Sequence, residues 1–313
     1  MIKIEYNDTL ANSHFSQVKS KIQKRIKSVL KAKGIVKNKK KIKMDAELEA
    51  FLNDLLDENE LKKMLTAKPA DLINTINQFK VSHKSFLKKR TNSSKILYNI
   101  FVKHGYDKID KLDFIKGIGL DTCLYCNRNY IYSLEKADKV KPQIDHFLPK
   151  SIYPFFGVSY YNLLPSCQTC NGLDVKGEKD PLKGKSKLTS PYLLTKGQFK
   201  FGYNIVSMDI LNPFAAGTNV EVFFTKKIAS HLRVFKLDKL YQKHADHVVE
   251  LITKSNLKYS DKYRTYLNSY PGLKMSDKEI NRLILGNYVE EDEVHKRPLA
   301  KLYQDIGEEL GLI

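Results

Sequence analysis

Four cysteines, arranged as two C-x-x-C pairs, constrain this chain more than any other feature of its sequence. Cys123 and Cys126 form the first pair, Cys167 and Cys170 form the second, and the chain has no other cysteine. Each C-x-x-C turn supplies two thiolates, so two such turns fill the four positions of a tetrahedral zinc ion. Two disulfides, buried thiols or a redox pair are the alternatives, and a reducing compartment favours the metal. The spacing therefore predicts a structural zinc site that clamps the ends of the segment between the pairs.

The segment between the two pairs carries a second group of polar residues. Asp145 and His146 lie in Q-I-D-H-F-L-P-K, where we expect a strand, so that adjacent side chains point to opposite faces. Asn162 follows in a loop, and Asn171 lies in a helix that we expect from Ser166 onward. Carboxylate and amide oxygens suit Mg²⁺ or Mn²⁺, and a neutral imidazole suits a general base near pH 7. The residues predict a hydrolytic site, although His146 taken alone also fits an ordinary core histidine.

This arrangement resembles the HNH endonuclease family, whose core is the ββα-metal fold, and the likeness covers about a fifth of the chain. The resemblance implies that Asp145 binds the catalytic metal and that His146 activates water. It also implies that Asn162 orients the base or steadies its loop, and that Asn171 completes the metal site from the helix. The two C-x-x-C pairs match the zinc-containing subgroup of this family.

Two further positions matter to this resemblance. Lys176 falls where many members carry a basic residue, which implies a phosphate contact. Asn171 stands where many relatives have histidine, so the oxygen ligands favour Mg²⁺ or Mn²⁺ over the zinc or nickel of His-rich versions.

Helical patterns flank the central segment on both sides. Apolar residues at three- and four-residue steps predict helices through most of 1–116, interrupted by a basic linker or loop at 37–43, and again from Thr225 to the end. Residues 124–132 favour strand, and 199–210 and 219–224 are predicted to form a small β-hairpin or strand pair. The predicted fold class is α+β and mainly α, with a small zinc-stabilised ββα-metal core flanked by helical regions. The expected regions are a basic helical N-terminal region at 1–116, the HNH core at 117–200, and a short β segment followed by helices at 201–313.

The net charge of +19 is concentrated at the N-terminal end of the chain. Residues 1–116 carry 26 Lys and Arg against 13 Asp and Glu, whereas 201–313 carry 16 against 15. Such asymmetry indicates a polyanionic partner, most simply DNA, although a lysine-rich genome also raises the count. We expect contacts with the phosphate backbone, and hence low sequence specificity, from Lys39, Lys40, Lys41, Lys176, Lys183, Lys185 and Lys187.

Two other groups of side chains have open interpretations. His244 and His247 lie one helical turn apart and are either a metal pair or ordinary packing residues, and packing is the simpler reading. Six tyrosines near the cysteines either stack on bases or pack the zinc core: Tyr125, Tyr130, Tyr132, Tyr153, Tyr160 and Tyr161.

No apolar run approaches the roughly 20 residues that span a bilayer, and the first residues do not resemble a signal peptide, so we expect a cytoplasmic protein with no membrane partner. The leading hypothesis is a metal-dependent endonuclease that hydrolyses DNA. An RNA nuclease, acting for example on tRNA, and a non-catalytic zinc-stabilised adaptor are the alternatives. The layout loosely resembles effector nucleases of bacterial anti-phage systems. In Septu-type and some retron systems such a nuclease works with a partner ATPase, which implies a similar partner here.

Overall fold

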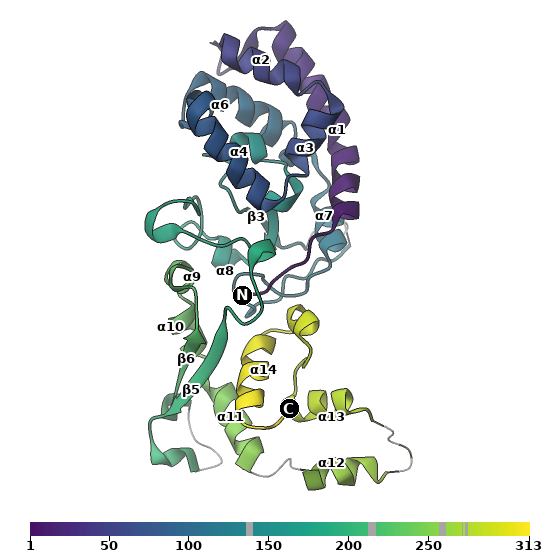
Figure 1. Cartoon of the computed structure of the whole chain (residues 1–313), viewed down its shortest axis with the longest axis vertical. Coiled ribbons are helices and arrows are strands. Elements are labelled where there is room, and N and C mark those ends of the chain that lie inside the picture. The colour runs from purple at the N-terminus through teal and green to yellow at the C-terminus, as the bar shows by residue number, and fades with distance from the viewer. Residues whose placement is uncertain (136–139, 212–216, 257–260, 271, 273–274) are drawn as a thin grey trace.

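The fold was analysed in a computed structural model that describes residues 1–135, 140–211, 217–256, 261–270, 272 and 275–313. The molecule is elongated, with the N-terminal helices at one end and the C-terminal helices at the other (Figure 1). The short strand β3 (Gln143–His146) and helix α8 (Gln168–Asn171) lie between these ends. In the described part of the chain the strands form three separate two-stranded antiparallel sheets. Most of the other elements are helices, so the fold is mainly helical, as predicted. No helix in the described ranges is long and apolar enough to cross a membrane.

Helix α1 (Asp8–Lys31) organises the N-terminal end. Asn7 caps it by accepting the backbone N–H of Leu10, and a stripe from Phe15 to Val29 is buried along one face. Shorter helices pack around this stripe, several of them capped by Asp or Thr side chains. They are α2 (Ala46–Asp54), α3 (Glu58–Leu65), α4 (Pro69–Ser82), α5 (Lys84–Leu87), α6 (Asn92–Leu97) with a π-helical continuation (Tyr98–Lys103), a 3₁₀ turn (Tyr106–Lys108) and α7 (Lys111–Ile118).

The prediction of a linker or loop at residues 37–43 is wrong. Strands β1 (Gly34–Lys37) and β2 (Lys40–Lys43) form an antiparallel hairpin in which Ile35 pairs with Ile42. Asn38 and Lys39 make the turn, both with positive φ, as a two-residue hairpin loop requires. Residues 37–43 contain one apolar residue, Ile42, so no alternating pattern marks the second strand.

The central segment contains two strands followed by a helix. Strand β3 pairs with β4 (Leu163–Ser166) in a register that sets Asp145 opposite Leu164 and His146 opposite Leu163. Helix α8 then follows, capped by Cys167 rather than by Ser166. The expected strand at residues 124–132 is absent, because the chain there turns around the first cysteine pair and makes one isolated bridge between Thr122 and Tyr130.

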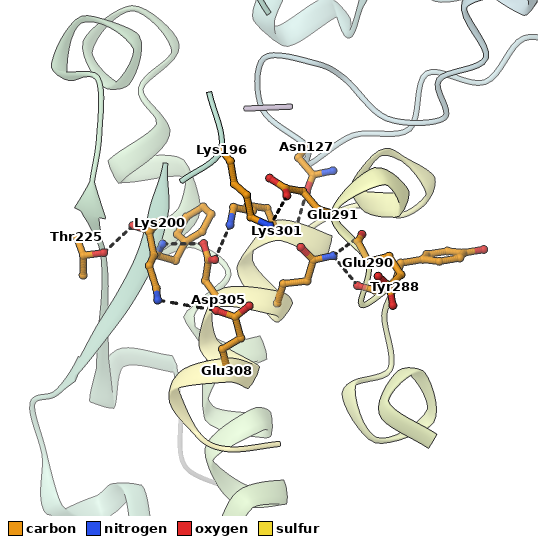
Figure 2. Close-up of polar contacts among 12 residues, drawn as sticks. Asn127, Lys196, Lys200, Thr225, Tyr288, Glu290, Glu291, Lys301, Asp305 and Glu308 are labelled. Atoms are coloured by element: carbon orange, nitrogen blue, oxygen red, sulfur yellow. Dashed lines mark hydrogen bonds and ion pairs between the residues drawn. The ribbon is translucent and has the colours of Figure 1, made fainter. Parts of the chain in front are cut away.

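The predicted hairpin in the C-terminal region is confirmed, as strands β5 (Lys200–Ile205) and β6 (Val220–Lys226). Helices follow, as expected from about Thr225, and the expectation for residues 257–260, 271 and 273–274 lies outside the described residues. They are α9 (Ala229–Phe235), α10 (Leu237–Gln242), α11 (Ala245–Asn256), α12 (Asp261–Asn268), α13 (Asp277–Leu285) and α14 (Ala300–Glu309). Helix α14 packs beside β5, where the Asp305 carboxylate accepts the backbone N–H of Phe201 at 2.9 Å (Figure 2).

Asn127 joins the first cysteine pair to the C-terminal region. Its buried side chain donates to the carbonyl of Val294 at 2.9 Å and accepts the N–H of Lys301 at 3.1 Å (Figure 2 shows it beside Lys301). Its backbone carbonyl accepts the N–H of Leu299 at 2.6 Å. Because Asn127 has a φ of +48°, the turn itself needs a residue that tolerates left-handed backbone.

Replacing Asn127 tests this junction. We expect Asn127→Ala to lower the free energy of unfolding by about 2–4 kcal/mol, from lost hydrogen bonds and left-handed strain together. Asn127→Gly loses the same side-chain bonds without the strain, so it should cost less. Denaturant unfolding of the zinc-loaded protein measures both, and equal losses would show that backbone strain contributes nothing.

Candidate functional site

The four cysteines come together as predicted. Their sulfur atoms all lie within 4.8 Å of one another, and all four residues are buried. Cys126 Sγ and Cys167 Sγ are 3.9 Å apart, close to the edge of about 3.8 Å that a tetrahedron with 2.3 Å zinc–sulfur bonds requires. The donor set and its geometry therefore fit a zinc ion.

Hydrogen bonds from the protein support thiolates in this cluster. The N–H of Arg128 donates to Cys126 Sγ at 3.4 Å, and Cys167 Sγ accepts from the Asn129 amide at 3.3 Å and the Cys170 N–H at 3.4 Å. Hydrogen bonds from the Cys123 thiol and then from its neighbours lower the pKa of Cys167 well below its ordinary value. A thiolate at this position is the form that binds a metal.

His146 is buried at the end of β3, and one of its ring nitrogens is hydrogen-bonded to backbone. Its Nε2 is 2.9 Å from the carbonyl oxygen of Gly157, which can only accept, so Nε2 carries the proton and Nδ1 carries the lone pair. Burial, and then the charge of Lys150, lower the pKa of His146 to about 3, so the ring is neutral at pH 7. The Tyr106 ring contacts it edge-on with centroids 4.4 Å apart. A neutral imidazole with a defined tautomer is suited to accept a proton.

Asn162 holds the loop that positions His146. Its Oδ1 accepts the N–H of Leu148 at 2.7 Å, and its Nδ2 donates to the carbonyls of Leu148 at 3.1 Å and Phe156 at 3.0 Å. Phe156 directly precedes Gly157, whose carbonyl bonds the histidine. Asn162 therefore fixes the loop between β3 and β4 through hydrogen bonds to its backbone.

Asp145 is held by an internal cation. The Lys176 ammonium lies 3.0 Å from each carboxylate oxygen, and it also donates to the carbonyl of His146 at 2.9 Å. The Tyr125 hydroxyl donates to Oδ2 at 2.5 Å, and burial followed by the Asp145 charge raises the pKa of Tyr125, so it keeps its proton. Lys176 is fully buried, so a phosphate contact does not fit its position in this structure.

Asp145 and Asn171, the predicted ligands for Mg²⁺ or Mn²⁺, do not form a site for a hard cation in this structure. Both Asp145 oxygens contact the Lys176 ammonium, and the residue is only 3% exposed. Asn171 is partly exposed on α8, and its amide nitrogen donates to Gln143 Oε1 at 2.8 Å. Among the described residues, the cysteines alone bring three or more His, Cys, Asp or Glu side chains close enough for an ion.

The predicted phosphate-contacting lysines, apart from Lys176, lie on the surface. Lys39, Lys40 and Lys41 are exposed on the β1–β2 hairpin. Lys183, Lys185 and Lys187 are exposed after α8, with Lys183 3.8 Å from the Asp180 carboxylate. Their contact with DNA stays a prediction.

The structure also shows what surrounds the two histidines and the six tyrosines whose roles the sequence left open. His244 accepts a hydrogen bond from Arg128 at 2.9 Å, and His247 hydrogen-bonds the Tyr303 hydroxyl at 2.7 Å, so both belong to the packing. Four of the six tyrosines are buried, which confirms the packing interpretation for them: Tyr125, Tyr153, Tyr160 and Tyr161. Tyr130 and Tyr132 are exposed and stack on each other with centroids 4.4 Å apart.

Sequence reasoning missed three contributors to the site. Tyr125, inside C-L-Y-C, was left open between stacking on bases and packing, and neither interpretation included its hydrogen bond to Asp145. Lys150 follows the Asp-His dipeptide closely, and its ammonium lies 4.9 Å from the centre of the Tyr106 ring. Tyr106 itself comes from the N-terminal region and no spacing signal connects it to His146.

A stretch of 61 residues of the chain is 43% identical to the Septu protein PtuB of Bacillus thuringiensis. This match covers 20% of the chain and 21% of PtuB, so the likeness is local. No family model matches the chain, and no solved structure matches it.

The zinc site predicts that a cysteine variant loses bound zinc and thermal stability. We expect the purified protein to carry zinc, and Cys170→Ser to lose most of it together with much of its thermal stability, because one of four ligands is removed. Zinc content by elemental analysis and the unfolding midpoint measure this. Thr169→Ala, on the exposed face of the same helix, should keep both, and full zinc retention in Cys170→Ser would contradict the Cys₄ site.

The buried ion pair predicts a strong coupling. We expect Lys176→Met to lower the free energy of unfolding by about 3–5 kcal/mol, because it leaves the Asp145 charge buried without its cation. The double variant Lys176→Met with Asp145→Asn removes both charges and should recover much of this loss. Denaturant unfolding of the single and double variants measures the coupling, and additive losses would show that the two charges do not interact.

Proposed function

We propose that this chain is an HNH-type endonuclease that hydrolyses phosphodiester bonds of DNA with low sequence specificity. The observation that carries the proposal is the setting of His146. Its ring is neutral, its Nε2 is held by the Gly157 carbonyl, and its Nδ1 is left with a lone pair. Such a group takes a proton from water when the water attacks phosphorus.

The groups around His146 suit a substrate with negative charge. Lys111 and Lys150 approach the Tyr106 ring at 4.7 and 4.9 Å, and that ring contacts His146. Their positive charges favour the phosphate and the charge that develops on it during attack. Asn162 keeps the histidine in place through the loop that carries Gly157.

An anti-phage role is supported by the local similarity to the Septu protein PtuB. In keeping with that similarity, we propose a partner ATPase that releases the nuclease activity, and low activity of the chain alone. The C-terminal region is the better candidate for docking such a partner, because 16 basic against 15 acidic residues leave it nearly neutral. Co-purification of the tagged chain with the product of a neighbouring ATPase gene tests this partnership.

The nuclease proposal predicts a specific loss in one variant. We expect the partnered protein to cut plasmid DNA, and His146→Ala to reduce the cleavage rate by at least about 100-fold while the fold is retained, because the base is lost. Gel assays with Mg²⁺, with Mn²⁺ and with EDTA measure the rate and show whether an added ion is needed.

His83→Ala, a histidine packed among aromatic rings at the end of α4, is the matched control and should cut as the parent does. Equal cleavage by His146→Ala and the parent would refute His146 as the base. Faster cutting of tRNA than of duplex DNA would reassign the substrate to RNA, and DNA binding without cleavage under any condition would favour a non-catalytic adaptor.

A further inference from the structure

We propose that a basic groove on α1 binds the phosphodiester backbone of the nucleic-acid strand that reaches His146. This inference rests on the proposed nuclease function and deepens it, because it says where the substrate is held. The groove, termed here the α1 groove, has a volume of about 470 Å³ and is lined by Lys21, Lys24, Arg25, Ser28, His104 and Lys108.

The α1 groove is built by the spacing of residues on one helix. Its four lining residues from α1 lie at positions i, i+3, i+4 and i+7, and therefore form one face of the helix. This face adjoins the buried stripe that contains Ile22 and Ile26. His104 and Lys108, from the end of the π-helical segment and the 3₁₀ turn, form the opposite wall.

No carboxylate lines the α1 groove, and its cations use neutral partners. Lys21 donates to the backbone carbonyl of Lys108 at 3.1 Å, and Arg25 donates to Asn99 Oδ1 at 2.8 Å. None of its Lys or Arg side chains forms an ion pair with a carboxylate of the described residues. The nearby Asp107 pairs instead with Lys103 at 2.9 Å.

The positive charges in the groove also act on its histidine. Burial, followed by the charges of Arg25 and Lys108, lowers the pKa of His104. Charge of one sign, gathered in a hollow without counter-ions from the protein, attracts an anion.

The α1 groove and the candidate catalytic histidine are linked through one turn of the chain. Lys108 and Tyr106 belong to the same 3₁₀ turn, with Lys108 lining the groove and the Tyr106 ring in contact with His146. Lys111 and Lys150 add two further cations at the Tyr106 ring. Several cations on either side of one turn suit a chain of phosphates better than a single free anion.

The basic runs that stand out in the sequence lack these features. Lys39, Lys40 and Lys41 are exposed on a hairpin, and Lys183 has an acidic neighbour at 3.8 Å. The groove residues are spread over two segments about 80 positions apart, so only their folding together creates the site.

The test measures DNA binding in the zinc-loaded chain of residues 1–313 that carries His146→Ala, so that no substrate is cut. The groove variant adds Lys24→Glu and Lys108→Glu, both at exposed positions. The control variant adds Lys62→Glu and Lys63→Glu on α3, which change the net charge by the same amount at exposed positions outside the groove. Fluorescence anisotropy with a labelled duplex gives the dissociation constant over a range of salt concentrations.

We expect the groove variant to bind at least about tenfold more weakly, with the salt slope reduced by about 2, since two phosphate contacts are lost. The control should bind within about twofold of its parent. Equal weakening of DNA binding in both variants would show that only net charge matters, and would overturn the proposal. Unchanged binding by the groove variant would overturn it too. Displacement of the duplex by low-millimolar inorganic phosphate would also overturn it, in favour of a free-anion pocket.

Two further readouts keep the outcomes separate. If the groove variant fails to fold, Lys24→Gln with Lys108→Gln removes the charges without reversing them and should weaken binding by several-fold. Unchanged DNA binding by the groove variant, together with DNA cleavage by the partnered parent protein, would refute the groove and leave the nuclease. Groove-dependent binding without any cleavage by the partnered protein would refute the nuclease and leave the groove.

Discussion

The packing of the chain around the cysteine cluster is the constraint on which the rest of the structure depends. Strands β3 and β4 and helix α8 have four residues each, too few to be stable by themselves. The two C-x-x-C turns fix both ends of this small unit. The first turn also holds the C-terminal region, since Tyr241 donates to the carbonyl of Cys126 at 2.6 Å and Asn127 bonds the segment before α14. A zinc ion there would stabilise the site and the docking of α14 together.

The buried polar side chains of the candidate site, Asp145 and His146, are stabilised by partners from distant parts of the sequence. The carboxylate of Asp145 is held by Lys176 and Tyr125, while His146 is kept neutral by its burial and by nearby lysines. A buried polar network that is fully paired is rigid, and a rigid site keeps its groups oriented. The same pairing explains why Asp145 does not present free oxygens to a second cation.

Much of the fold could be predicted from local pattern, and the errors have physical causes. The long helices and the β5–β6 hairpin follow from periodicity and turn residues, which act over a few positions. The β1–β2 hairpin was missed because residues 37–43 contain only one apolar residue, Ile42, and so show no alternating pattern. Residues 124–132 form turns because the sulfur atoms of the first pair must converge. At the site, spacing predicted that the four cysteines converge, whereas the phosphate contact implied for Lys176 does not fit its buried position.

The sequence by itself determined the four candidate zinc ligands and the candidate base, because each depends on residue type and short spacing. Only the tertiary structure decided which cation neutralises Asp145, which ring covers His146 and where a basic hollow lies. Lys176 is 31 positions from Asp145, Tyr106 is 40 positions from His146, and the walls of the α1 groove come from separate segments. Contacts of this kind arise when apolar faces pack together, and no local pattern records which polar side chains that packing brings into contact.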